Sequence, residues 1–114
     1  MGGFRKYRAV KSQCYAAHTH DSKREAARCN ELHDMQSNGE ITNLIIHPQY
    51  WFVINGCQLK HPNGRRVGYK SDFEYIRSGL KITEDVKGFV VRDWPLRRAV
   101  FTALFTDHTL IVSV

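Results

Sequence analysis

Residues 67–87, VGYKSDFEYIRSGLKITEDVK, decide the predicted fold because apolar and polar side chains alternate on both sides of Ser78-Gly79. Side chains of a strand alternate between its two faces, so each half predicts a strand, and Ser-Gly predicts a turn between them. Pairing across this turn would place Asp72 beside Asp85 on adjacent strands. Asp85 and Lys87 would then share the face of the second strand that points away from its apolar side chains.

A helix is expected upstream of this hairpin. Ser22 precedes apolar residues at helical spacing, and Ser22 with Glu25 has the spacing of a capping box. Asn38-Gly39 suits a helix C-terminus and ends the run. Residues 41–46 and 50–54 are strand-like and are separated by a proline. The segment before the hairpin therefore predicts one helix and two short strands.

A second helix is expected downstream of the hairpin. Asp93 can cap this helix, and Pro95 suits its first turn. Residues 109–114 form a last strand-like run. The predicted apolar stripe of the helix comprises Leu96, Val100, Ala103 and Leu104, with Phe101 and Phe105 alongside.

The predicted order of elements is helix, three or four strands, helix, strand. This order indicates an α/β protein of the layered α+β kind, with a mixed central sheet of four to five strands flanked by two main helices. A chain of 114 residues has room for one hydrophobic core. We therefore expect a basic N-terminal arm, residues 1–20, followed by a single domain, residues 21–114.

Charge is distributed unevenly along the chain, which has 17 Lys and Arg against 11 Asp and Glu, a formal net charge of +6. The acids gather in residues 21–40 and 72–85, whereas residues 41–71 contain no acidic residue. The basic residues of that acid-free segment are Lys60, Arg65, Arg66 and Lys70. Basic surface around a compact acidic group suggests a polyanion held against metal-binding carboxylates, and a soluble protein of high pI is an equal alternative.

The three cysteines, Cys14, Cys29 and Cys57, are widely spaced and form no Cys-x-x-Cys pair. This spacing argues against a zinc knuckle and a disulfide scaffold, and it fits a reducing compartment. No apolar run approaches the roughly 20 residues of a membrane span, and the N-terminus lacks the apolar core of a secretory signal. We therefore expect a cytoplasmic protein with no membrane partner.

The candidate chemistry lies in the predicted pair of Asp72 and Asp85. Two carboxylates held close together repel each other unless a cation or a proton offsets their charge. Carboxylate oxygens suit Mg²⁺ or Mn²⁺, and Lys87 could hold the attacking water or stabilise charge on a phosphate. The alternative is that these side chains form solvated cross-strand ion pairs, which the spacing alone favours.

Asp72 followed by Asp85-Val86-Lys87, after a hairpin and before a helix, resembles the motif of the PD-(D/E)XK nuclease superfamily, whose members are restriction-endonuclease-like and resolvase-like. More narrowly, the chain resembles short phage and prophage proteins of that superfamily. The stretches that carry the resemblance are Lys6-Tyr7-Arg8, Asp21-Ser22-Lys23-Arg24-Glu25-Ala26-Ala27-Arg28, Gly39-Glu40-Ile41, His47-Pro48-Gln49-Tyr50, Tyr69-Lys70-Ser71-Asp72-Phe73-Glu74-Tyr75 and Glu84-Asp85-Val86-Lys87-Gly88.

This resemblance implies catalytic roles for particular residues. Asp72 matches the first acid of the motif, and Asp85 and Lys87 match the second acid and the lysine. The carbonyl of Val86 would be a further metal ligand. Glu25 matches the acidic residue that many members place on the first helix, facing the metal.

Three neighbouring positions qualify the match. Glu25 could instead point back to the backbone as part of a capping box, although the resemblance favours the metal role. Ser71 stands where the motif is named for proline, a position that varies in the superfamily. Glu84 lies on the apolar face by parity, or at a solvated strand end, and it is left out of the core site although it could support a second metal.

The expected function is that of an Mg²⁺-dependent endodeoxyribonuclease, with Mn²⁺ as a possible substitute, that hydrolyses phosphodiester bonds and selects DNA by structure rather than by sequence. Partners would be DNA and either a second copy of the chain or another phage protein, in the host cytoplasm if a phage encodes it. The basic residues expected to contact DNA are Arg5, Lys6, Arg8, Lys11, Lys23, Arg24, Arg97 and Arg98.

Two alternatives stay open from the sequence. One is a nuclease-fold protein that binds DNA or a protein without cutting, because a fold does not fix a function. The other is a nuclease that acts on RNA.

Overall fold

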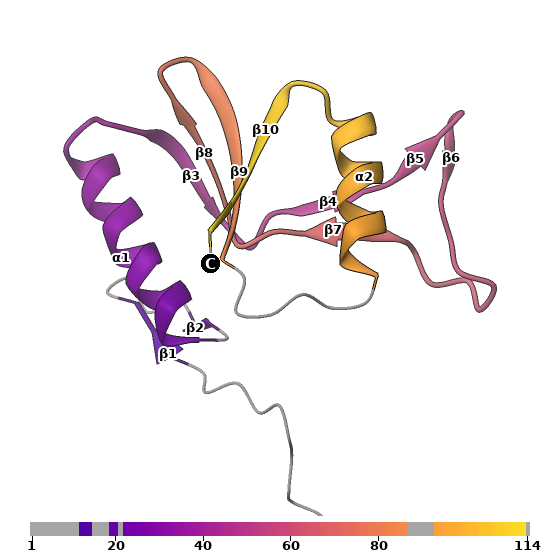
Figure 1. Cartoon of the computed structure of the whole chain (residues 1–114), viewed down its shortest axis with the longest axis horizontal. Coiled ribbons are helices and arrows are strands. Elements are labelled where there is room, and N and C mark those ends of the chain that lie inside the picture. The colour runs from indigo at the N-terminus through magenta and orange to yellow at the C-terminus, as the bar shows by residue number, and fades with distance from the viewer. Residues whose placement is uncertain (1–11, 15–18, 21, 87–92, 114) are drawn as a thin grey trace, which may run out of the picture.

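The described part of the chain is an α+β fold in which two helices flank a mixed four-stranded sheet (Figure 1). The computed structural model describes residues 12–14, 19–20, 22–86 and 93–113. In spatial order the sheet contains β10 (His108–Ser113), β9 (Leu80–Val86), β8 (Phe73–Arg77) and β3 (Thr42–Ile46), and the helices are α1 (Lys23–Ser37) and α2 (Trp94–Leu104). The predicted mixed sheet with two main helices is confirmed at this level.

Strands β8 and β9 form the predicted hairpin. Arg77 pairs with Leu80, and the two turn residues Ser78 and Gly79 have φ angles of 52° and 77°. Positive φ at both central residues is typical of the two-residue turn whose twist matches that of paired strands. The turn therefore fixes the register that brings the acidic ends of the two strands together.

Helix α1 begins and ends where the sequence predicts. Ser22 is the N-cap, and its Oγ accepts a hydrogen bond from the Glu25 backbone N–H at 3.1 Å. Gly39 follows the C-cap Asn38 with a φ of 79°, the left-handed conformation that glycine adopts without a steric penalty. Local hydrogen bonding thus sets both ends of the helix that carries Glu25.

Strand β10 is parallel to β9, and the other neighbouring strands of the sheet are antiparallel. Parallel neighbours need a crossover, which α2 provides between β9 and β10. Because α1 and α2 lie on opposite faces of the sheet (Figure 1), the central strand β9 is covered on both faces.

A β-arm, residues 49–70, extends the chain beyond strands β3 and β8. Two backbone hydrogen bonds join it to the sheet, from His47 N–H to the Asp72 carbonyl (2.9 Å) and from Ser71 N–H to the Pro48 carbonyl (3.0 Å). The arm contains β4 (Gln49–Trp51) paired with β7 (Gly68–Lys70), and β5 (Val53–Ile54) paired with β6 (Cys57–Gln58). The sheet therefore bends at His47 and Asp72, where the arm begins.

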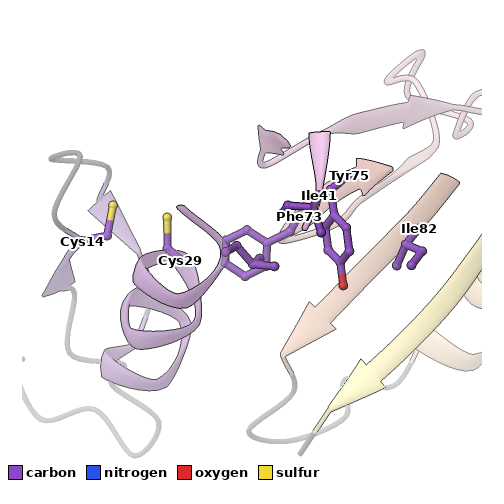
Figure 2. Close-up of a cluster of buried hydrophobic side chains, with 7 residues drawn as sticks. Cys14, Cys29, Ile41, Phe73, Tyr75 and Ile82 are labelled. Atoms are coloured by element: carbon purple, nitrogen blue, oxygen red, sulfur yellow. The ribbon is translucent and has the colours of Figure 1, made fainter. Parts of the chain in front are cut away.

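The hydrophobic interior has two parts, one on each side of the sheet. The α1 core comprises Cys14, Cys29, Leu32, Ile41, Phe73, Tyr75 and Ile82 (Figure 2). The α2 core comprises Tyr50, Phe52, Tyr69, Trp94 and Phe101. Burial raises the pKa of the Cys29 thiol to about 12, so without a bound cation the thiol is neutral and packs as a small apolar group.

The buried face of α2 differs from the predicted stripe. Trp94 and Phe101, seven residues apart, are buried, whereas Leu96 is 69% exposed and Leu104 also faces outward. The prediction was wrong for Leu96, Ala103 and Leu104, whereas Val100, Phe101 and Phe105 do pack in the α2 core. This helix has apolar residues on more than one side, and only packing against the β-arm selects the face that is buried. Arg97 lies in the first turns of α2, and its guanidinium Nη1 donates to the Gly68 carbonyl of the arm.

The N-terminal part that the structure describes contains a two-stranded sheet, β1 (Ser12–Gln13) with β2 (Thr19–His20), beside α1. Among the described helices, neither has the combination of length and apolar character that a membrane span requires.

Candidate metal centre

The bend in the sheet and the β8–β9 register gather acidic side chains from distant parts of the sequence. Phe73 pairs with Glu84, so the next step along both strands places Asp72 opposite Asp85. Helix α1 contributes Glu25, and the end of β3 contributes His47, which has a φ of 54°. The predicted proximity of the two aspartates is confirmed.

Glu25, His47 and Asp72 form a compact group in which one ligand atom from each side chain lies within 4.8 Å of the others. Glu25 Oε2 is 2.8 Å from His47 Nε2, a hydrogen bond in which the imidazole N–H donates to the carboxylate. Glu25 is buried, while Asp72 and His47 are half-buried. The group thus has both buried anionic ligands and a side open enough to receive an ion.

Asp85 completes the group from β9, beside Asp72. Its carboxylate Oδ2 accepts a hydrogen bond from the Tyr69 hydroxyl, and burial raises the pKa of Tyr69, so this hydroxyl stays protonated and donates. The Val86 backbone N–H donates to Asp72 Oδ2 at 2.7 Å. Both aspartates are therefore held in place by donors outside the pair.

Burial raises the pKa of Asp72 to about 9, with a hydrogen bond from the protonated Asp72 to the neighbouring Asp85 carboxylate and the charges of Asp85 and Glu25 adding to the effect. The Val86 N–H acts in the opposite direction but does not offset burial. Without a cation, the Asp72 carboxyl is thus protonated at neutral pH. A divalent ion would replace this proton.

The raised pKa of Asp72 predicts that the metal-free protein loses stability as the pH rises. Between the ordinary value of 3.8 and about 9, the folded protein holds a proton that the unfolded chain does not, so the free energy of unfolding falls with increasing pH. Urea unfolding at pH 6 and pH 8.5 in EDTA should show this fall, and Asp72→Asn should reduce it. An unchanged slope in Asp72→Asn, with Asp34→Asn as the exposed control, would contradict the assignment.

The burial of β9 corrects one expectation about its outward face. The face carrying Thr83 and Asp85 was expected to point away from the apolar side chains, yet Asp85 is only 2% exposed and Thr83 is fully buried. The α2 core and Tyr69 cover this face. The alternative of a solvated cross-strand ion pair is therefore wrong for Asp85, because its carboxylate has no open water layer around it.

The contacts of Glu25 bear on the two roles that the sequence left open for its carboxylate, a helix cap or a metal ligand. Its backbone N–H donates to the capping Ser22 side chain, whereas its carboxylate lies against His47 in the acidic group. The carboxylate is thus placed for ion binding, and the side chain of Ser22 caps the helix.

Glu84 is part of a separate buried ion pair on the α1 side of the sheet. Arg28 Nε and Nη2 donate to its two oxygens at 2.6 and 2.9 Å, and the Tyr75 hydroxyl donates at 2.6 Å. Since Glu84 is 2% exposed, it is neither solvated nor directed toward the acidic group. The suggestion that it supports a second metal is not favoured by these contacts.

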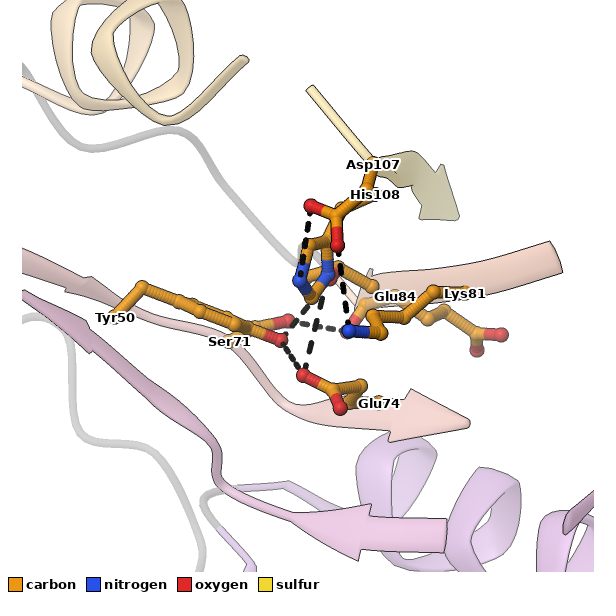
Figure 3. A network of polar contacts seen from close by, with 8 residues as sticks. Tyr50, Ser71, Glu74, Lys81, Glu84, Asp107 and His108 are labelled. Carbon is orange, nitrogen blue, oxygen red and sulfur yellow. Dashed lines mark hydrogen bonds and ion pairs between the residues drawn. The ribbon is translucent and has the colours of Figure 1, made fainter. Parts of the chain in front are cut away.

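A polar network links the β-arm to the sheet on the α2 side (Figure 3). The Tyr50 hydroxyl donates to Glu74 Oε1 at 2.6 Å and lies 3.0 Å from Thr83 Oγ1, which is 2.8 Å from His108 Nδ1. Burial lowers the pKa of His108, although the nearby Glu74 charge acts against it. This network fixes β4 against β8, β9 and β10 and so holds the bend beside the acidic group.

The structure describes only some of the other predicted site residues. Lys87 and the basic residues Arg5, Lys6, Arg8 and Lys11 lie outside the described residues, so their roles stay predictions. Lys23 and Arg24 are exposed on α1, and Arg98 is exposed on α2 with its guanidinium 5.3 Å from the Trp94 ring centroid. Arg97 is partly committed to structure, because it bonds Asp93 at 2.9 Å and the Gly68 carbonyl.

The β-arm carries basic residues that the list of DNA contacts omitted. Lys60, Arg65, Arg66 and Lys70 are all exposed, and Arg66 lies 3.9 Å above the Trp51 ring. An open groove of about 390 Å³ between the arm and α2 is lined by Arg66, Lys70, Arg97 and Tyr69, among others. The run of residues 41–71 without acids was the sequence signal for this surface.

His47 and Tyr69 were missed as members of the site. The sequence offers no spacing signal for His47, because its partner Glu25 is 22 residues away on a different element. Tyr69 shares the apolar face of its predicted strand, so the sequence pattern indicated no polar role for it. Its hydroxyl reaches Asp85 only because the β-arm folds over β9.

The donor set fits a divalent cation. Glu25, His47 and Asp72 each bring one ligand atom to within 4.8 Å of the others, and Asp85 lies against Asp72. Such oxygen and nitrogen ligands suit Mg²⁺ or Mn²⁺, the imidazole favouring the latter. Burial, more than the charges of Asp85 and Glu25, raises the pKa of Asp72, and a bound cation would favour its charged form.

The molecule is thus an α+β protein with a carboxylate–imidazole centre at a bend in a mixed sheet. The chain belongs to the family described as "protein of unknown function (DUF1064)", whose model matches residues 4–114. No curated protein and no solved structure matches the chain.

Proposed function

We propose that this protein is a metal-dependent phosphodiester hydrolase that acts on DNA as an endonuclease. The observation that carries the proposal is the convergence of Glu25, His47 and Asp72 at one bend of the sheet, with Asp85 in contact with Asp72. Repulsion within such a group destabilises the fold unless an ion or a proton offsets it. Groups whose pKa is strongly perturbed by burial and by a charged neighbour cluster at functional sites.

The arrangement of elements supports a restriction-endonuclease-like core. A helix is followed by three antiparallel strands, a second helix, and a strand parallel to the third. The acids Asp72 and Asp85 lie on the second and third of these strands or at their ends, and Glu25 lies on the first helix. These are the positions that the resemblance to the PD-(D/E)XK superfamily implies.

The residues divide the work of hydrolysis as follows. Asp72 and Asp85 would hold the divalent ion, with Glu25, the Val86 carbonyl and His47 as further ligands or as partners of bound water. The ion would supply charge neutralisation at the phosphate and a water that loses its proton readily. Tyr69 is a positioning residue, because it acts through the hydrogen bond that its hydroxyl donates to Asp85.

In the reaction, the water oxygen forms a bond to phosphorus and the bond to the 3′-oxygen breaks. The Glu25 carboxylate, which lies next to Asp72 and accepts from His47, would take the proton of the attacking water, and solvent would protonate the 3′-oxygen that leaves. Lys87 would stabilise the charge on the phosphate oxygens, as the motif implies.

The exposed basic residues of the β-arm support a nucleic acid as the substrate. Lys60, Arg65, Arg66 and Lys70 occupy a segment without acids, and the arm begins at the acidic group itself. Contacts of this kind go to backbone phosphates and carry no base sequence. Selectivity would therefore come from the shape of the DNA or from a partner.

Removing two arm cations should weaken DNA binding and its dependence on salt. For Arg66→Ala/Lys70→Ala we expect the slope of log K against log[salt] to fall by about 1 to 2, because each phosphate contact to duplex contributes about 0.9. Fluorescence anisotropy from low to moderate salt measures both quantities. Arg77→Ala, an exposed arginine at the far end of β8, is the matched control, and equal loss in both variants would argue against the arm.

The proposal is tested by incubating the protein with linear duplex, single strand, flap, four-way junction and matching RNA. Each substrate is assayed with Mg²⁺, with Mn²⁺ and with EDTA, beside Asp85→Ala/Lys87→Ala. Metal-dependent cleavage that the double variant loses supports the proposal, and the preferred substrate defines the task. Salt-sensitive binding without cleavage under every condition would overturn it in favour of an accessory DNA-binding protein.

A further inference from the structure

Two cysteines that the sequence keeps 15 residues apart meet a histidine at the N-terminal side of the α1 core. One ligand atom from each of Cys14, Cys29 and His33 lies within 4.8 Å of the others. Cys29 and His33 stand four residues apart on α1, the spacing that puts two side chains on one helix face. Cys14 follows β1, and Figure 2 shows its sulfur and that of Cys29 on the same side of the helix.

We propose that Cys14, Cys29 and His33 form a binding site for a thiophilic divalent cation of the zinc class. In a tetrahedral zinc site, ligand atoms lie about 3.5 to 3.8 Å apart, as metal–ligand distances of about 2.3 Å for sulfur and 2.0 Å for nitrogen require. The observed limit of 4.8 Å is within side-chain adjustment of that geometry. Two thiolates and one imidazole are a common zinc donor set, which leaves the fourth position for water.

Burial and access both suit such a site. Cys14 and Cys29 are buried among apolar side chains, which shields the thiolates from bulk solvent, whereas His33 is half-buried. Binding would displace the thiol protons, so the ion and the protons compete for the two sulfur atoms.

The ion would fasten the N-terminal segment to α1. Strands β1 and β2 lie beside α1, and Cys14 is the described residue that joins β1 to the core. Cys29 is one helical turn beyond Glu25, so a fixed α1 also fixes the first ligand of the acidic group. The two sites have different donor chemistry, sulfur here and carboxylate there, and the proposal does not rest on the proposed function.

The test uses the full-length protein, kept reduced and stripped of metal, titrated with Co²⁺ under anaerobic conditions. A thiolate ligand gives Co²⁺ an intense near-ultraviolet charge-transfer absorption, which carboxylate sites lack. We expect this absorption at one ion per chain, its loss on adding Zn²⁺, and a rise in Tm on Zn²⁺ binding of at least about 5 °C.

Matched variants distinguish this site from other ions and thiols. Cys14→Ser and His33→Gln should abolish the absorption or lower the affinity for Co²⁺ at least about tenfold. Cys57→Ser, which removes an exposed thiol, and Asp85→Ala should leave the absorption unchanged. Circular dichroism checks folding, and the His33→Gln result decides the matter if Cys14→Ser does not fold. No charge-transfer absorption in the wild type, or absorption that survives both Cys14→Ser and His33→Gln, would overturn the proposal.

Discussion

Asp85→Asn should lose metal-dependent DNA cleavage by at least about 100-fold while keeping the fold and the affinity for DNA. Asparagine has the shape of aspartate and can still accept from the Tyr69 hydroxyl, but it brings no negative charge to the ion. The side chain is 2% exposed, so no neighbouring surface carboxylate can take its place. Single-turnover cleavage with Mg²⁺ and with Mn²⁺ measures the loss.

The control for this variant is Asp34→Asn, which removes an exposed carboxylate from α1 and should cleave at the wild-type rate. Unfolding in EDTA should show that Asp85→Asn is no less stable than the wild type, because it removes a buried charge and the asparagine can still accept from the Tyr69 hydroxyl. Cleavage by Asp85→Asn at the wild-type rate would place the catalytic centre elsewhere.

Arg28→Ala should destabilise the protein by about 3 kcal/mol, since removing one partner of a buried ion pair leaves an uncompensated charge. Glu84 would keep only the Tyr75 hydroxyl of its three short donors. The loss should be at the lower end of the range for such pairs because the Arg28 side chain is 27% exposed. Urea unfolding by circular dichroism measures the change in the free energy of unfolding.

Two companions separate the ion pair from general effects of an altered helix surface. Arg24→Ala, on the exposed side of α1, should change stability by no more than about 0.5 kcal/mol. Arg28→Met/Glu84→Gln, which removes both charges, should be more stable than Arg28→Ala alone. A loss below about 1 kcal/mol in Arg28→Ala would mean that Glu84 does not depend on this arginine.

Local sequence patterns were sufficient to predict the elements that carry the acidic group. The Ser22–Glu25 cap and Gly39 defined α1, and the Ser78-Gly79 turn fixed the register that sets Asp72 against Asp85. Each depends on a local feature, such as a capping hydrogen bond or a positive φ, that a few neighbouring residues determine.

The sequence failed where burial depended on elements far away in the chain. The phase of α2 and the covering of β9 on both faces follow from how the β-arm and α2 pack, and periodicity could not select between several apolar faces. His47, Tyr69 and the pairing of Glu84 with Arg28 were not predicted for the same reason, as their partners are 16 to 56 residues away.

By itself, therefore, the sequence determined the helices, the β-hairpin and the pairing of Asp72 with Asp85, because hydrogen bonds and turn geometry act locally. Only the tertiary structure decided which carboxylates are buried, that Glu25 and His47 join the aspartates, and that Cys14, Cys29 and His33 meet. Burial and ligand geometry depend on the sum of contacts from all elements around a side chain, which no short stretch of sequence contains.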